Sequence, residues 1–415
     1  MMETENGVVR NMKKPHIVIL GAGYGGMMTA AKLQKSMKAN EAVITLVNNN
    51  DYHYQTTWLH ENAAGTLHHE RTKIKIKDVI DSRKIELVLD EVICIKPEEK
   101  LVKLAKQELT YDYLVIGLGF EPATFGIPGL EENSFSIGNI NNARAIREHL
   151  DYNFASYHNE SEKNAARLNI VIGGGGFTGI EFAGELANRI PQLCKEYDIE
   201  KTQVRLIVLE GASTVLPGFD EKLVAYAMNS LASRGVEFIN EALLQECNSD
   251  SIVFEKDGKR TELPTMTTIW AAGIRANTVV EKSGFRTNSG KVEVQSDMST
   301  PDFDDVFVIG DCSLILDHDT GRPLPSTAQI AIQQAEIVAH NVKAKVRGWK
   351  LKTFVPNPLG TIASLGNDDA IAVVSGRRLF GWKASVMKKM SDNRYLLKLG
   401  GLGLLMRKGK FNFFY

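Results

Sequence analysis

The chain has 415 residues, more than one hydrophobic core usually holds, so we expect at least two domains. Hydrophobic residues make up 43% of it and charged residues 24%, a balance that is typical of a globular protein and excludes a disordered or low-complexity chain. The N-terminal residues MMETENGVVRNMKKP lack the apolar core of a signal peptide, and no run of about 18 apolar residues follows, so we expect neither secretion nor a membrane span.

Cysteine spacing and net charge exclude further classes of protein. The four cysteines are far apart and form no C-x-x-C or C-x4-C pair, so we expect no redox dithiol, no disulfide framework and no metal site. The formal net charge is −1, and we expect no nucleic-acid partner.

The first informative segment is HIVILGAGYGGMMTAAKLQKSM, at residues 16–37. A buried strand, a glycine turn and an apolar pattern at helical spacing follow one another there. Gly21, Gly23 and Gly26 form G-x-G-x-x-G: the first allows the tight turn, the second lets the backbone approach a pyrophosphate, and the third packs helix against strand. The segment therefore predicts a dinucleotide site with the phosphates at the helix N-terminus.

A second strand, AVITLVN, ends at Asn48. Many folds of this kind place an acidic residue there to hold the ribose hydroxyls. Asparagine also forms hydrogen bonds, though less distinctively. Asn48 is therefore either a ribose-binding residue or a strand-end residue with a structural role.

The same order of elements returns in LNIVIGGGGFTGIEFAGELANRI, at residues 168–190. Gly174, Gly176 and Gly179 form a second fingerprint, and the next strand, VRLIVLE, ends at Glu210. A carboxylate there accepts hydrogen bonds from both ribose hydroxyls of the adenosine and repels a 2′-phosphate. We therefore expect NADH rather than NADPH, with a solvated strand-end residue as the alternative reading of Glu210.

The C-terminal tail, residues 377–415, is strongly basic. It holds ten Lys or Arg and a single acidic residue, Asp392. Read as a helix, its apolar residues fall within one narrow arc: Leu379, Trp382, Val386, Met390 and Leu397. A basic amphipathic segment of this kind lies flat on an anionic membrane surface. The alternative is a helix that packs its apolar arc on the protein's own core or on a partner subunit.

With two fingerprints in place, the chain resembles the two-dinucleotide-binding flavoproteins, α/β proteins of two Rossmann-type domains in which an FAD domain is split around an NAD domain. The segments YDYLVIGLGFEP and TIWAAGIRAN resemble the motifs that close the two domains, and TPDFDDVFVIGDC resembles the late FAD motif. The resemblance implies that Asp311 contacts the ribityl chain of FAD. It also implies an FAD domain at 1–165 and 290–365, an NADH domain at 166–289 and an amphipathic membrane-anchoring region at 366–415.

Within that superfamily, NDYHYQTTWLH and STAQIAIQQAE resemble segments of the type II NADH dehydrogenases, which are NADH:quinone oxidoreductases that pump no protons. The resemblance implies that Ala328 and Gln329 lie beside FAD, that Gln329 and Gln333 line a quinone pocket, and that Thr56 and Thr57 face the quinone. Helical spacing puts the two glutamines on one face. The alternative is a face of small residues packed against a neighbour.

The reaction implied is hydride transfer from NADH to FAD, followed by two-electron reduction of a membrane quinone, menaquinone or ubiquinone. Glu181 matches the G-x-E with which the family binds NADH. We expect it to be ionised, because a helix N-terminus lowers a carboxyl pKa, and the alternative role is a structural cap. Lys388 or water is the candidate proton donor. The enzyme is expected on the cytoplasmic side of the cell membrane as a peripheral protein, and a homodimer stays open.

Other functions remain to be weighed. A sulfide:quinone oxidoreductase needs cysteines beside the flavin, and the cysteines here do not match that arrangement. A reductase of a small electron-transfer protein needs none. An NADH-sensing flavoprotein that acts through dimerisation would show slow flavin reoxidation that no quinone accelerates.

Overall fold

The computed structural model describes residues 14–317, 321–366 and 368–411. The first 13 residues, where the sequence shows no signal-peptide pattern, and the last four residues of the tail therefore lie outside the described residues. The chain forms two compact units. The first unit contains Met1–His53, Lys75–Phe120 and Arg275–Asn357. The second unit contains Tyr54–Ile74, Glu121–Ile274 and Pro358–Tyr415. The compact units do not coincide with the expected domains: residues 54–74, residues 121–165 and the C-terminal region lie in the unit that holds the second fingerprint, and residues 275–289 lie in the first unit. The domain bounds themselves stay a prediction.

The first unit is built on a five-stranded parallel sheet in the order β22-β9-β1-β2-β5. Its strands are β1 (His16–Leu20), β2 (Val43–Asn48), β5 (Glu86–Leu89), β9 (Tyr113–Ile116) and β22 (Val306–Val308). The central strands β9, β1 and β2 are rich in branched apolar residues, as expected for a parallel sheet buried on both faces. Strand β1 lies in the middle, so the glycine turn that follows it opens at the carboxyl edge of the sheet.

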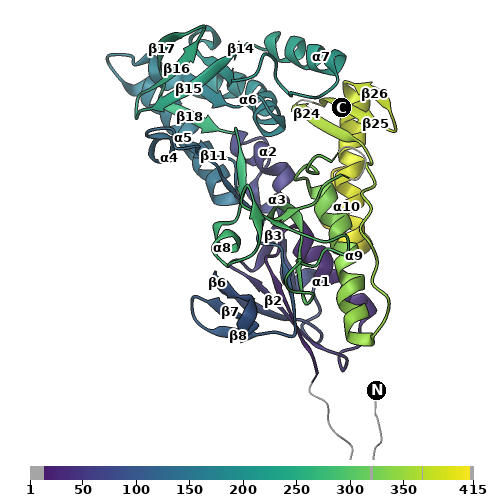
Figure 1. The fold of residues 1–415 in the computed structure, drawn as a ribbon. Helices are drawn as coiled ribbons and strands as arrows, with labels where there is room; N and C mark the ends of the chain where they lie inside the picture. The colour runs from purple at the N-terminus through teal and green to yellow at the C-terminus, as the bar shows by residue number, and fades with distance from the viewer. Residues whose placement is uncertain (1–13, 318–320, 367, 412–415) are drawn as a thin grey trace, which may run out of the picture. The chain divides into compact units, whose positions relative to one another are not determined.

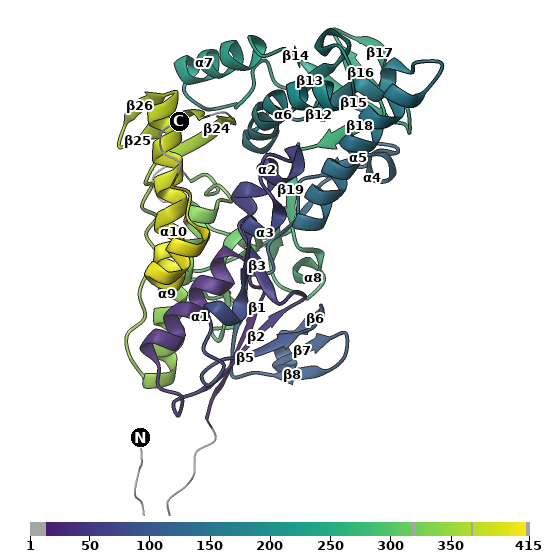
Figure 2. The ribbon, with the colours of Figure 1, turned by 180° about the vertical axis from the view of Figure 1, so that it is seen from behind.

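Helices cover one face of this sheet and a small β-meander the other. The helices α1 (Tyr24–Ser36) and α9 (Ala328–Arg347) lie side by side (Figure 1, Figure 2). The meander consists of β6 (Val92–Lys96), β7 (Leu101–Leu104) and β8 (Glu108–Thr110), and its apolar residues share one core with those of β1. The unit also contains α8 (Thr278–Glu281) and the small sheet β20-β21-β23 (Thr287–Asn288, Lys291–Glu293, Ser313–Leu314).

The second unit repeats the plan with the parallel order β11-β18-β12-β13-β14. The strands are β11 (Phe135–Ser136), β12 (Asn169–Gly173), β13 (Arg205–Glu210), β14 (Val236–Asn240) and β18 (Thr267–Trp270). Its helices are α2 (Leu59–Ala64), α3 (His69–Thr72), α4 (Leu130–Asn133), α5 (Ile140–Asn159), α6 (Phe177–Glu196) and α7 (Glu221–Ala232). An antiparallel sheet closes one side: β15 (Ala242–Cys247), β16 (Ser251–Lys256) and β17 (Lys259–Pro264). Two Rossmann-type sheets in one chain confirm the expected fold class.

Two further ladders are each made of two short strands. One pairs β3 (Tyr52–Tyr54) with β4 (Lys73–Lys75), and the other pairs β10 (Phe120–Pro122) with β19 (Ile274–Ala276).

The C-terminal region forms an antiparallel sheet and a long helix within the second unit. The elements are β24 (Thr361–Gly366), β25 (Asp369–Val374), β26 (Arg377–Phe380) and α10 (Trp382–Lys408). The expected helical arc is wrong at Leu379, which lies in β26, because Gly381 takes a left-handed φ of 63° and the helix begins only after it. The helix is kinked at Gly401, and among the described helices none combines the length and apolarity needed to cross a bilayer.

The helix α10 turns its apolar arc outward. Ala384, Leu396 and Leu399 are buried, whereas Trp382, Met390 and Leu397 are about half exposed. The arc therefore does not pack on the core of its own unit. Three of the basic residues of the tail are largely buried instead, in ion pairs of Lys388 with Glu181, Lys389 with Asp368 and Lys410 with Glu61, whereas Arg378 of β26 pairs with Asp220 at the surface.

Candidate functional site

The first glycine turn has the geometry of a pyrophosphate cradle. Gly21 has a φ of 91°, and a Cβ on Gly26 would lie 1.8 Å from the carbonyl oxygen of Gly21, so the helix touches the turn backbone to backbone. Nothing lies within 4 Å of the corresponding position on Gly23, which is the N-cap of α1 and provides no side-chain cap. The open N-terminus of α1 thus fits the pyrophosphate of FAD.

The second turn has the same geometry. Gly174 has a φ of 110°, a Cβ on Gly179 would lie 2.0 Å from the carbonyl oxygen of Gly174, and the space beside Gly176 is open. Gly176 is the N-cap of α6 and again provides no side-chain cap. The residues present therefore fit a second dinucleotide, which we assign to NADH in the next subsection.

The strand-end residues Asn48 and Glu210 brace these two turns. The Asn48 Oδ1 accepts a hydrogen bond from the Ala22 N–H at 3.0 Å, and Glu210 Oε2 accepts one from the Gly175 N–H at 2.6 Å. The other oxygen of Glu210 accepts from the Ala212 N–H at 2.8 Å. A structural role for both residues is thus visible, and ribose binding by them stays a proposal.

Asp311 lies in the turn after β22, in the first unit. It is only partly exposed, and burial raises the pKa of its carboxyl, which lies close to Ser326 and Lys291. Gly310 N–H donates to Gln334 Oε1 at 2.7 Å, so α9 holds this turn in place. The contact of Asp311 with FAD stays a proposal.

The glutamines of α9 share one partner. The Nε2 atoms of Gln329 and Gln333 donate to the Asn357 carbonyl at 3.2 and 2.9 Å, and Gln333 Oε1 accepts from the Asn357 N–H at 2.9 Å. The helical spacing that placed them on one face is confirmed. Ala328, the first residue of α9, follows the N-cap Thr327, whose side chain accepts from the Ile330 N–H. The contact of Ala328 and Gln329 with FAD and the contact of the two glutamines with a quinone stay proposals.

Thr56 and Thr57 begin a short 3-10 helix that ends at Trp58. The indole of Trp58 is fully buried, and its N–H donates to Asp392 Oδ2 at 2.8 Å. The two threonines therefore lie next to a buried contact between the 3-10 helix and α10.

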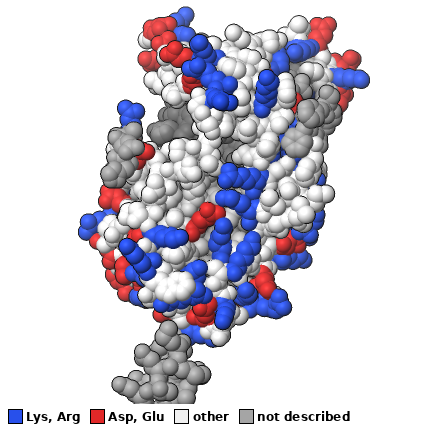
Figure 3. All heavy atoms as spheres, turned by 90° about the vertical axis from the view of Figure 1, so that its right-hand side faces the viewer, with Lys and Arg blue, Asp and Glu red and all other residues white. Residues whose placement is uncertain are grey.

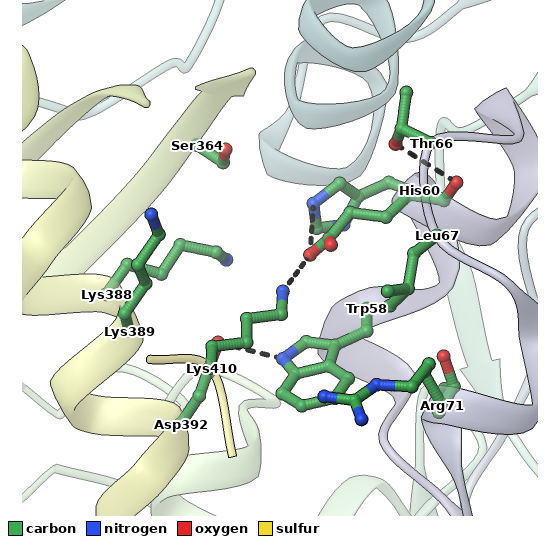
Figure 4. Close-up of polar contacts among 12 residues, drawn as sticks. Trp58, His60, Thr66, Leu67, Arg71, Ser364, Lys388, Lys389, Asp392 and Lys410 are labelled. Carbon is green, nitrogen blue, oxygen red and sulfur yellow. Dashed lines mark hydrogen bonds and ion pairs between the residues drawn. The ribbon is translucent and has the colours of Figure 1, made fainter. Parts of the chain in front are cut away.

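That contact belongs to a largely buried polar cluster inside the second unit, part of which is drawn in Figure 4. The cluster consists of Trp58, His60, Glu61, Thr66, Glu181, Glu185, Ser364, Lys388, Asp392 and Lys410. Its members come from α2, α6, β24 and α10, and from the residues next to α2 and α10. The sequence marked Glu181 and Lys388 separately, and the structure brings them together.

Glu181 is fixed by three partners. Its Oε1 accepts from Lys388 Nζ at 2.7 Å and from the Ser364 N–H at 3.0 Å, and His60 Nδ1 lies 3.6 Å from Oε2. Burial by itself would raise the pKa of Glu181, but Lys388 and the other partners outweigh it and the pKa is lowered. The expected low pKa is confirmed, and its main cause is this ion pair rather than the helix N-terminus.

The cluster holds more carboxyls than cations. Glu61, Glu181, Glu185 and Asp392 stand against Lys388 and Lys410, so full ionisation would leave a buried negative charge. Burial raises the pKa of Glu185 to about 7 and also raises that of Asp392. Burial opposes the charge on Lys388, but Glu181 and Asp392 raise its pKa overall. Near neutral pH Glu185 is therefore protonated in part of the molecules, which reduces the buried negative charge.

The sequence analysis missed most of this cluster. Glu185 accepts from Thr66 Oγ1 at 2.5 Å, and Lys410 Nζ pairs with Glu61 and lies 4.2 Å from the centre of the Trp58 ring. Within the described part of the chain, buried His60 Nε2 has no hydrogen-bond partner. The available signal was the spacing of Glu181 and Glu185, which puts two carboxyls on one face of α6.

The cysteines offer no reactive thiol pair. All four are free, and burial raises the pKa of Cys194, Cys247 and Cys312, the last to about 12. A thiol with such a pKa is hardly ionised at neutral pH and is a poor nucleophile.

The two fingerprints on two parallel sheets define the class as a dinucleotide-dependent oxidoreductase, and comparisons with known proteins agree. Residues 15–335 match the family model for pyridine nucleotide-disulphide oxidoreductases. The NDH2 of Plasmodium falciparum, solved in complex with NADH, has the same fold with a TM-score of 0.84 at 18% identity, over 95% of this chain and 98% of that one. A sulfide:quinone oxidoreductase from Aquifex aeolicus follows with a TM-score of 0.75 at 23% identity, over 93% and 91%.

Similarity in sequence decides the particular family. The chain is 42% identical to the type II NADH:quinone oxidoreductase of Staphylococcus aureus over 395 residues, which are 95% of this chain and 98% of that protein. Identity to the Staphylococcus epidermidis protein is also 42% over the same shares. The chain belongs to the type II NADH:quinone oxidoreductases.

Glu185 generates a prediction about stability. Its pKa rises from 4.5 to about 7 on folding, so its favourable contribution is complete below pH 4.5 and is lost as the pH rises through 7. Glu185→Gln removes this dependence. The unfolding free energy of the variant relative to wild type should rise between pH 4.5 and pH 8 by on the order of 3 kcal/mol, measured by urea titration. A difference that does not change with pH would contradict the prediction.

Glu210 generates a prediction about cofactor choice. Glu210→Arg should shift the ratio of kcat/KM for NADH over NADPH towards NADPH by at least about tenfold, because a guanidinium attracts the 2′-phosphate that the carboxylate repels. Glu210→Gln is the control: it keeps an acceptor for the Gly175 N–H and should weaken the discrimination without reversing it. An unchanged ratio in the arginine variant would remove Glu210 from the ribose site.

Proposed function

We propose that this chain oxidises NADH and reduces a quinone by way of FAD, without pumping protons. The observation that carries the proposal is the pair of open glycine cradles, one at the carboxyl edge of each parallel sheet, in a chain of this family. FAD, when bound, accepts two electrons as hydride and releases them to an acceptor, which a side chain cannot do.

The residues of the chain supply binding and charge. Gly21, Gly23 and Gly26 would hold the pyrophosphate of FAD, with Asn48 and Asp311 at its ribose and ribityl parts. Gly174, Gly176 and Gly179 would hold that of NADH, with Glu210 at the adenosine ribose. Ala328 and Gln329 would lie beside FAD, and Thr56, Thr57, Gln329 and Gln333 would bind the quinone, menaquinone or ubiquinone.

Glu181 and Lys388 would act together at the reaction centre. Because Lys388 is held as a cation by two carboxylates, it suits the stabilisation of negative charge better than the release of a proton. We keep Glu181 as a residue that binds NADH, with its carboxylate oriented by Lys388 and by the Ser364 N–H.

Chemistry at a thiol is the main rival and is disfavoured here. The sulfide:quinone oxidoreductase has a similar fold, but the four cysteines of this chain are unpaired and three of them are buried. No specific observation favours a protein acceptor or a sensor.

We also propose that α10 attaches the protein to the cytoplasmic side of an anionic membrane. Trp382, Met390, Leu397 and Met406 are between 48% and 67% exposed on this helix, and the exposed Arg394 lies among them. In Figure 3, Lys and Arg side chains stand among uncharged surface on the face turned to the viewer, with some Asp and Glu between them. An exposed apolar arc beside cations binds lipid interfaces through both burial and charge. A homodimer stays a proposal of its own.

Anaerobic stopped-flow mixing tests the function and its quinone residues. NADH should bleach the flavin rapidly, and a short-chain quinone should restore it rapidly; slow restoration would point to another acceptor. Gln329→Ala should slow restoration by about tenfold, the size of one hydrogen bond to the quinone, and leave bleaching unchanged. Lys343→Ala, near the other end of α9, is the control. If both half-reactions slowed alike, Gln329 would only support the segment at Asn357.

Membrane attachment is tested by changing the exposed arc alone. The double variant Trp382→Ser, Leu397→Ser should sediment less with phosphatidylglycerol vesicles, while its activity with a water-soluble quinone stays near wild type. Leu243→Ser is a matched control, because Leu243 is 61% exposed but lies on β15. Equal binding by all three proteins would exclude α10 as the attachment site.

A further inference from the structure

Phe125 has a backbone conformation that rarely carries a large side chain. It lies in a turn closed by a hydrogen bond from the Ile127 N–H to the Thr124 carbonyl at 3.0 Å. Phe125 and Gly126, the two central residues, have φ values of 52° and 71°. Turns with two left-handed central residues favour Asn, Asp or Gly at the first of them, because a larger residue meets its own backbone there. A phenylalanine at this place is strained.

Burial does not offset the strain. The side chain of Phe125 is 72% exposed. Its ring is nevertheless held, because it lies over Gly273, where a Cβ would come within 2.5 Å of it, and its edge faces the Trp270 ring with the centroids 6.5 Å apart. A large apolar surface is thus fixed in position and faces outward.

The turn is tied directly to the second fingerprint. Trp270 ends β18, and its ring packs on Gly173, where a Cβ would lie 2.7 Å from it. The Trp270 indole N–H donates to the Ala123 carbonyl at 2.8 Å, and the Ala123 N–H donates to the Gly273 carbonyl at 3.2 Å. The position of the Phe125 ring is therefore set relative to the strand that leads into Gly174.

Sheet topology says which half of the dinucleotide passes this ring. Strand β12 lies between β13 and β18, and a dinucleotide binds across the carboxyl ends of the strands at such a switch point. In the proposed site, the adenosine end of the dinucleotide binds at Glu210, at the end of β13, and the pyrophosphate binds at the N-terminus of α6. The other half must then run towards the end of β18, where Gly273 and Phe125 lie.

We propose that Phe125 positions NADH by packing its ring against the nicotinamide. The inference rests on the proposed function, because it assumes that the second fingerprint binds NADH. An aromatic ring gains both apolar contact and stacking from such a ligand, and the contact explains why the strained phenylalanine is exposed.

The test compares two ligands on the FAD-loaded enzyme by titration calorimetry. NAD⁺ contains the nicotinamide riboside and ADP-ribose lacks the nicotinamide. Phe125→Gly should weaken NAD⁺ binding by about tenfold, the size of one aromatic contact, and change ADP-ribose binding by less than about twofold. It should also raise the KM for NADH while the rate of flavin reoxidation by quinone stays the same.

Two controls separate a loss of folding and an unspecific loss of aromatic surface from a loss of the proposed contact. Phe125→Gly relieves the left-handed strain, so its melting temperature should equal or exceed that of wild type, and weaker binding then reflects lost contact rather than unfolding. Tyr152→Ala removes another exposed aromatic side chain of the same unit and should change neither affinity. Unchanged NAD⁺ binding, or an equal loss for both ligands, would overturn the inference. Failure of ADP-ribose to bind wild type would instead overturn the NADH site, and with it the proposed function.

Discussion

The structure depends on one close contact between a helix and the glycine turn before it, and this contact occurs once in each unit. In each unit a helix begins so near to the turn before it that a single methyl group on Gly26 or Gly179 would lie about 2 Å from a carbonyl oxygen. Only this contact lets the helix start directly above the end of the central strand, with its uncapped N–H groups facing open space. The side chains of Asn48 and Glu210, at the strand ends, hold the turns in that position by accepting hydrogen bonds from backbone N–H groups of the turns.

Charge burial is the second constraint, and it explains the basic tail. Part of the positive charge of the C-terminal region is not available to a membrane, because Lys388 and Lys410 pair with Glu181 and Glu61 inside the second unit. A buried carboxylate without such a partner would be costly. The exposed arc of α10, which we propose attaches the protein to a membrane, is thus separate from Lys388 and Lys410, which compensate acids of α2 and α6.

Strain at Phe125 differs in kind from the glycine contacts. At Gly21 and Gly174 the left-handed backbone is occupied by the residue that adopts it without cost. At Phe125 it is occupied by a residue that resists it and that remains 72% exposed. Local strain that the fold does not need is a physical reason to look for a ligand.

The sequence by itself determined the two strand-turn-helix units, the strand ends at Asn48 and Glu210, and the common face of Gln329 and Gln333. These features follow from glycine spacing and periodicity within about twenty residues. It could not decide that β26 takes Leu379 out of the helix, or that Glu181 meets Lys388, 207 residues away. Nor could it show that Glu185 retains a proton or that the ring of Phe125 is exposed. Those outcomes depend on burial and on partners brought together by the folded chain, and burial energies are set by the whole environment of a group rather than by its neighbours in sequence.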